Sequence, residues 1–240
     1  MKKDAYFNTL LIVFVVSIVI SNVVGARVIT TGVSIGGIEL ATSGGAITYA
    51  FTFLCTDIIG EIWGKKKAMD VVKYGFIGQL FALAMIIATG WCKAVDSHID
   101  AAYATLLGQN WSFVLGSLCA YYASQSWDVV IFHRLRDWYV RCRLKGVAYA
   151  GQGRWIWNNF STSTSQIIDT AIYASIAFGF GMGWFFDTSK WTSLAGLFFG
   201  QYVLKLCLAV LDTPFFYALT CRKFVGWLSN DPTVYGNGKK

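Results

Sequence analysis

Five acids and one cation lie within long apolar stretches of this sequence. They are Asp57, Glu61, Asp128, Asp169 and Asp212, opposed by Lys205. A charged side chain at the centre of a membrane helix costs about 2.5 to 3.5 kcal/mol on insertion scales, so such residues usually have a functional reason. In the pairs Gln125/Asp128 and Gln166/Asp169, a glutamine precedes an acid by three residues, so each pair shares one helix face.

A carboxylate beside an amide can bind the edge of a planar heterocycle. The carboxylate accepts from ring N–H and exocyclic NH2 groups, while the amide donates to a ring carbonyl. Gln201 and Lys205, four residues apart, add an amide and an ammonium in the last apolar stretch. We therefore expect one polar binding site built from several helices, with aromatic residues nearby that could stack on a ring.

The composition identifies the kind of protein that holds these residues. The chain has 240 residues, of which 55% are hydrophobic and 14% are charged, and its mean hydropathy is +0.51. Soluble domains average about 25% charged residues. These values exclude a disordered chain, a nucleic-acid-binding domain and an ordinary soluble enzyme, and they indicate a protein that crosses a membrane several times.

Six segments are long and apolar enough to cross a membrane. They are 6–24, 46–62, 71–91, 111–132, 164–186 and 191–219. With the N-terminus in the cytoplasm, 16 of the 20 Lys and Arg residues lie inside, three lie outside and Lys205 lies within a span. We predict an all-α bundle of six transmembrane helices, one domain over 1–240, with both termini cytoplasmic. The net charge of +7 then reflects topology, not nucleic-acid binding.

Three segments have alternative interpretations. Segment 6–24 could be a signal peptide, which would leave the orientation of the rest unchanged. Segment 27–40 is β-branched and glycine-rich, so it predicts a hairpin or a segment dipping into the membrane, while an ordinary loop is the simpler alternative. Segment 153–164 is polar without acidic residues, and we expect a loop that leads into the fifth span.

Each charged residue also has a purely structural interpretation. The structural pairs would be Glu61 with Lys65, Asp212 with Arg222, and Lys205 with Asp169 or Asp57. Gly196 and Gly200 form a GxxxG motif, which indicates close packing inside the bundle or a homodimer contact.

The sequence contains no recognisable catalytic set. His98 and His133 have no second histidine at ligand spacing, and no two of the six cysteines are close enough in sequence for a CxxC pair. We expect no catalytic residue, no metal site and no cofactor.

Several short strings resemble the bacterial queuosine precursor transporter family, also called the vitamin uptake transporter family. They are TDIIGEIWG at 56–64, SQSWDV at 124–129 with HRLR at 133–136, NN at 158–159, and SQIIDT at 165–170. The resemblance implies a multi-pass protein of the bacterial inner membrane, not an enzyme. It would take up 7-cyano-7-deazaguanine, 7-aminomethyl-7-deazaguanine or a queuine-type base for tRNA modification, by secondary or facilitated transport.

The resemblance also implies a substrate site. By motif position the site would contain Asp57, Gln125, Asp128, Asn158, Asn159, Gln166, Asp169 and Lys205, with Glu61 and Asp212 as candidates for proton transfer or gating. The expected partners are a deazapurine and the lipid bilayer, with no nucleic acid. Two alternatives stay open: the binding subunit of an importer that a separate module energises, and an intramembrane enzyme.

Overall fold

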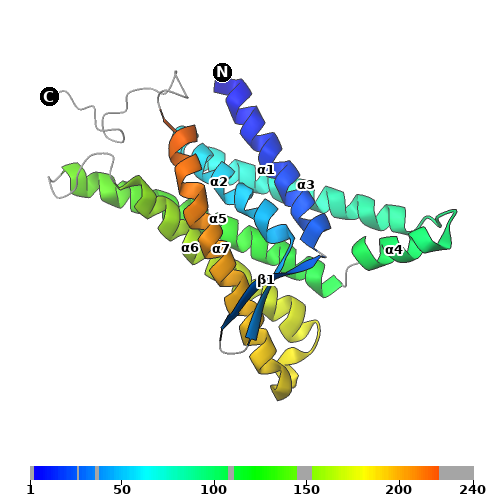
Figure 1. The fold of residues 1–240 in the computed structure, drawn as a ribbon. Helices are drawn as coiled ribbons and strands as arrows, with labels where there is room; N and C mark the ends of the chain where they lie inside the picture. The colour runs from blue at the N-terminus through cyan, green and yellow to red at the C-terminus, as the bar shows by residue number, and fades with distance from the viewer. Residues whose placement is uncertain (1–2, 26, 36–37, 108–110, 145–152, 222–240) are drawn as a thin grey trace.

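The structure is a computed structural model that describes residues 3–25, 27–35, 38–107, 111–144 and 153–221. These residues form an all-α fold with one small β-hairpin (Figure 1). The elements are α1 (Lys3–Gly25), β1 (Val28–Ile35), β2 (Ile38–Ser43), α2 (Gly45–Trp63), α3 (Lys65–Gly90), α4 (Ser97–Leu107), α5 (Trp111–Leu144), α6 (Arg154–Tyr173) and α7 (Trp191–Leu219).

Helix α2 is the centre of the bundle. It packs against α1, α3, α5 and α7, and Figure 1 shows it between α1 and α7. Its most apolar stretch is 67% buried, against 17%, 22% and 17% for α1, α3 and the segment containing α7. The outer helices instead expose large apolar side chains such as Ile12, Phe81 and Phe199, as expected of surfaces that face lipid.

Four helices are long and apolar enough to cross a membrane: α1, α2, α3 and α7, the last with the turn before it. They contain the expected spans 6–24, 46–62 and 191–219 and all but the last residue of 71–91. The expected spans 111–132 and 164–186 fall on α5 and on α6 with the segment after it, which are richer in polar residues. The six-span topology with both termini in the cytoplasm therefore stays a prediction.

The polar segment 153–164 is helical and not the loop that we predicted. Helix α6 begins at Arg154, and the hydroxyls of Ser161 and Thr162 bond to the carbonyl of Asn158 in the preceding turn. Serine and threonine disfavour helices when their side chains compete with the backbone, but here they bond within the helix and are buried. The sequence pattern could not show this burial.

Helix α6 does not continue unbroken to residue 186. After Tyr173 the chain forms a π-helix, Ala174–Phe180, and then two short 3₁₀ turns, Trp184–Phe186 and Thr188–Lys190. Helix α4 is a further difference, because our six spans left the segment between 91 and 111 without a helix.

The segment at 27–40 is a β-hairpin that extends to residue 43. Its strands are antiparallel, with Val28 opposite Ser43 and Ile35 opposite Ile38. Strand β2 lies against α7, as Figure 1 also shows. Of the interpretations that the sequence left open, the hairpin is confirmed.

Candidate functional site

A narrow cavity with a polar lining lies between α2, α6 and α7, and we call it the polar cavity. Its volume is about 10 Å³, which is room for about one water molecule. Its polar lining residues are Tyr49, Thr162, Gln166, Lys205 and Asp212. The remaining lining is apolar and includes Phe53 and Leu208.

Asp169 lies beside this cavity and is fully supplied with hydrogen-bond donors. Its carboxylate pairs with the Lys205 ammonium, accepts from the Tyr49 hydroxyl at 2.9 Å and accepts from the Ser124 hydroxyl at 3.1 Å. These four residues come from α6, α7, α2 and α5. Of the two partners that the sequence offered for Lys205, the structure selects Asp169.

Three other acids lie near one another, and we call them the acidic triad: Asp57, Asp128 and Asp212, of which Asp212 lines the polar cavity. The carboxyl groups of Asp57 and Asp128 contact each other, and Asp212 is close enough to interact electrostatically with both. All three are buried, with exposed fractions of 2%, 0% and 9%. The structure therefore brings together acids from α2, α5 and α7 that are far apart in sequence.

The hydroxyl groups around the triad support it weakly. Thr162 Oγ1 lies 3.4 Å from the Asp57 carboxylate but 2.9 Å from the backbone carbonyl of Asn158. Ser165 Oγ lies 3.3 Å from Asp128 but 2.8 Å from the carbonyl of Thr162. Because a hydroxyl has a single hydrogen, the shorter backbone contact takes most of it, and the carboxylates keep unused accepting capacity.

Several buried polar atoms around the cavity have no hydrogen-bond partner within the described part of the chain. They are Asp128 Oδ2, Asp212 Oδ1, Gln166 Oε1 and both amide atoms of Asn158. Their residues are between 0% and 9% exposed. A buried polar atom without a partner costs about 1 to 3 kcal/mol, so a group of them needs an explanation such as a bound ligand.

Two predicted site residues face other helices instead of the cavity. The Gln125 amide donates to Thr52 Oγ1 at 2.8 Å and accepts from Thr56 Oγ1 at 3.3 Å, so it ties α5 to α2. The Asn159 amide donates to Thr213 at 2.8 Å and accepts from it at 3.1 Å, so it ties α6 to α7. Both amides already have protein partners.

Glu61 forms a different ion pair from the one that its spacing suggested. It pairs with Arg154 at 3.2 Å and Arg136 at 3.6 Å, and Arg154 also donates to Thr220. The pairing of Glu61 with Lys65 is wrong because α2 ends before Gly64, whose φ of 84° and ψ of 175° only glycine adopts readily. The i,i+4 rule applies within one helix, and here the helix is broken.

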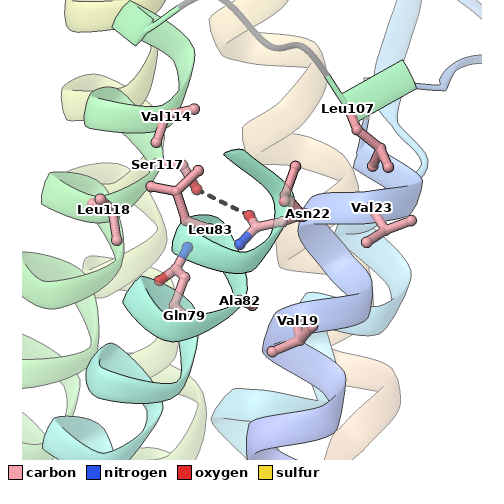
Figure 2. A pocket seen from close by; sticks show the side chains of 11 residues that line it. Val19, Asn22, Val23, Gln79, Ala82, Leu83, Leu107, Val114, Ser117 and Leu118 are labelled. Atoms are coloured by element: carbon pink, nitrogen blue, oxygen red, sulfur yellow. Dashed lines mark hydrogen bonds between the residues drawn. The ribbon is translucent and has the colours of Figure 1, made fainter. Parts of the chain in front are cut away.

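A second, mainly apolar cavity lies between α1, α3 and α5 (Figure 2). Its volume is about 50 Å³, and Ser117 donates to the Asn22 amide at 3.2 Å on its wall. Gln79 lies on the same wall, so this amide is not part of the polar cavity.

The expected partner of Asp212, Arg222, lies outside the described residues. The neighbour of Asp212 within the described residues is Asn158.

Comparison with known proteins identifies the family of the chain. Residues 43–219 match the family described as "Putative vitamin uptake transporter". This chain belongs to that family.

Two bacterial proteins, both named "Probable queuosine precursor transporter", are similar to this chain. The protein from Bacillus subtilis (strain 168) is 27% identical over 175 residues, which cover 72% of this chain and 69% of that protein. The protein from Haemophilus influenzae (strain ATCC 51907 / DSM 11121 / KW20 / Rd) is 24% identical over 172 residues, covering 70% of this chain but only 63% of the relative. No solved structure matches the chain.

The family and the bacterial relatives, together with the four long apolar helices, identify a multi-pass transporter-family protein of the bacterial inner membrane. The matched region begins at the end of β2 and ends with α7, so it contains every residue of the polar cavity and of the acidic triad.

Sequence reasoning missed the hydroxyl groups of the site. Tyr49 and Ser124 bind Asp169, while Thr162 and Ser165 face the triad. A signal for the α6 residues was present, because positions 158, 162, 165 and 169 recur every three or four residues and share one helix face. Treating 153–164 as a loop concealed that pattern.

Proposed function

We propose that this chain carries a queuosine-precursor base across the inner membrane into the cytoplasm, by secondary or facilitated transport through six spans. The observation that supports this proposal best is the group of buried acceptor atoms without donors around the polar cavity, on residues of α5, α6 and α7. An excess of buried acceptors matches a ligand that is rich in N–H donors.

A deazaguanine has this character. Its ring N–H groups and exocyclic NH2 are donors, and its ring carbonyl is an acceptor. In the proposed complex, carboxylates of the site accept from the N–H groups, and Lys205 or Gln166 donates to the carbonyl. Asn158 lies beside Asp212, and neither of its amide atoms has a described partner within 3.5 Å, so its amide can donate to the base and accept from it. The names of the two relatives point to the same substrate class.

The cavity must widen before a bicyclic base can bind, because it now holds about one water molecule. Transporters move their helices to expose a central site to each side in turn. The ion pairs of Glu61 with Arg136 and Arg154 join α2, α5 and α6, so in this proposal they are the contacts that a movement of α6 must break or carry along.

The decisive experiment uses a bacterial strain that can neither make nor take up queuosine precursors. Cells that express this chain are fed each candidate base separately, and queuosine in their tRNA is measured. We expect queuosine to return with at least one of 7-cyano-7-deazaguanine, 7-aminomethyl-7-deazaguanine and queuine. Failure with all three, when the protein is present in the membrane, would reject the proposal.

A pair of variants connects the experiment to the site. Asp128→Asn removes a carboxylate of the triad, and we expect it to abolish uptake while the protein still inserts. Asp70→Asn is the matched control, because Asp70 lies near the start of α3, away from the cavity, and pairs only with Lys73 in the described residues. Normal uptake by Asp128→Asn would show that the triad is not the substrate site.

A further inference from the structure

The five buried acids of this chain fall into two groups by their partners. Glu61 and Asp169 each pair with basic side chains. The acidic triad, Asp57, Asp128 and Asp212, has no basic side chain within 4.0 Å anywhere in residues 3–144 and 153–221 that the structure describes. In the described bundle, the acidic triad is therefore a group of buried carboxyl groups that has no basic partner.

Neighbouring amides indicate that a ligand belongs at this place. Gln166 is 3% exposed and lines the polar cavity with an Oε1 atom that has no described partner. Asn158 is 1% exposed and interacts with the Asp212 carboxyl group, but neither of its amide atoms has a described partner within 3.5 Å. Buried carboxyl groups that contact each other must share a proton or bind a cation, and buried amides without partners need donors and acceptors, so a cationic ligand with several N–H groups suits this place.

We propose, on the basis of the proposed function, that the acidic triad makes this transporter selective for a cationic base over a neutral base of the same size. An aminomethyl substituent carries an ammonium near neutral pH, as a lysine side chain does. It offers three N–H donors and a full positive charge. A cyano or hydroxymethyl substituent offers neither the charge nor the three donors.

The polar groups along α7 suggest how such a base lies. Lys205 and Asp212 are seven residues apart, which is about 10 Å along the helix axis and comparable with the length of a substituted bicyclic base. Lys205 repels a second cation, so the ammonium lies at the Asp212 end among the triad. The guanine-like edge then faces Gln166, whose Oε1 atom has no described partner, at the end of the cavity beside the Asp169–Lys205 pair.

The test compares three bases in proteoliposomes that contain the full-length chain: 7-aminomethyl-, 7-hydroxymethyl- and 7-cyano-7-deazaguanine. The hydroxymethyl base has nearly the shape of the aminomethyl base but no charge. We expect half-saturating uptake of the aminomethyl base at a concentration at least about tenfold lower than that of either neutral base, since a hydrogen bond to a charged group is stronger than a neutral one. Equal values for the aminomethyl and hydroxymethyl bases would overturn the inference and leave the proposed function intact.

A second, independent measurement compares the preference for the aminomethyl base in two variants. Asp212→Asn should lower the preference for the aminomethyl base about tenfold, while Asp70→Asn should leave it unchanged. Full preference in a folded Asp212→Asn protein would overturn the role of the triad. Absence of uptake for all three bases would overturn the proposed function and this inference with it. If Asp212→Asn does not fold, the comparison of the three bases on the natural chain still decides.

Discussion

Replacing Lys205 with methionine should destabilise the protein, because it leaves the Asp169 carboxylate buried without its cation. The ammonium of Lys205 and the carboxylate of Asp169 form a pair whose side chains are 10% and 8% exposed. Removing one partner of a buried pair typically costs about 3 to 5 kcal/mol. The hydroxyls of Tyr49 and Ser124 remain on Asp169, so we expect the lower end, about 3 kcal/mol.

The assay is the apparent melting temperature of the purified protein in detergent, at one scan rate for every variant. For a chain of this size 1 kcal/mol corresponds to about 2 to 4 °C, so Lys205→Met should melt about 6 to 12 °C lower. Membrane proteins commonly unfold irreversibly, which is why the scan rate must be held constant.

The double variant Lys205→Met/Asp169→Asn is the control that isolates the charge. The asparagine carbonyl can still accept from Tyr49 and Ser124, and no buried charge is left alone. We expect the double variant to regain at least half of the lost stability. If Lys205→Met melts within about 3 °C of the natural chain, or if the double variant melts as low as the single one, the reasoning is refuted.

The same double variant separates a structural pair from a substrate-binding pair. If the pair only holds α6 to α7, uptake should return together with stability. If the pair contacts the base, as we propose, stability should return and uptake should not.

Three further predictions concern residues around the site. Gln125→Leu should lower the melting temperature because it removes the 2.8 Å hydrogen bond to Thr52 of α2 and a weaker 3.3 Å contact with Thr56. Gln166→Leu should keep stability and lose uptake, and melting curves and uptake assays of both variants will check this. Glu61→Gln should destabilise by about 2 to 4 kcal/mol because two arginines lose their carboxylate, while Lys65→Ala should stay within about 0.5 kcal/mol; equal melting temperatures for the two would contradict the observed pairing. Gly64→Ala should destabilise by about 1 to 3 kcal/mol in the same assay, and an unchanged melting temperature would show that the α2–α3 junction tolerates a side chain.

The sequence predicts the membrane class and the set of buried polar residues well. Asp57, Asp128, Asp169 and Lys205 were identified because charge in an apolar stretch is costly, and the structure gathers them around one cavity or beside it. Helical spacing predicted that Gln166 and Asp169 share a face, which agrees with their positions at the cavity and beside it.

Partner choice could not be predicted, because it depends on packing between helices. Gln125 and Gln166 have the same spacing to an acid, yet the first is held by two threonines of α2 and the second is not. Glu61 pairs with Arg136 and Arg154, which lie 75 and 93 positions further along the chain, instead of with Lys65. One glycine with positive φ was enough to make the local rule fail there.

The hydroxyl groups of Thr162 and Ser165 on α6 bear on whether the helix stays intact when a substrate binds and leaves. Thr162 and Ser165 each have two acceptors within reach, one on their own helix and one on an acid across the gap. If the substrate binds these acids, as we propose, each hydroxyl can keep its hydrogen bond to the carbonyl of its own helix. Binding and release would then leave the backbone hydrogen bonds of α6 intact.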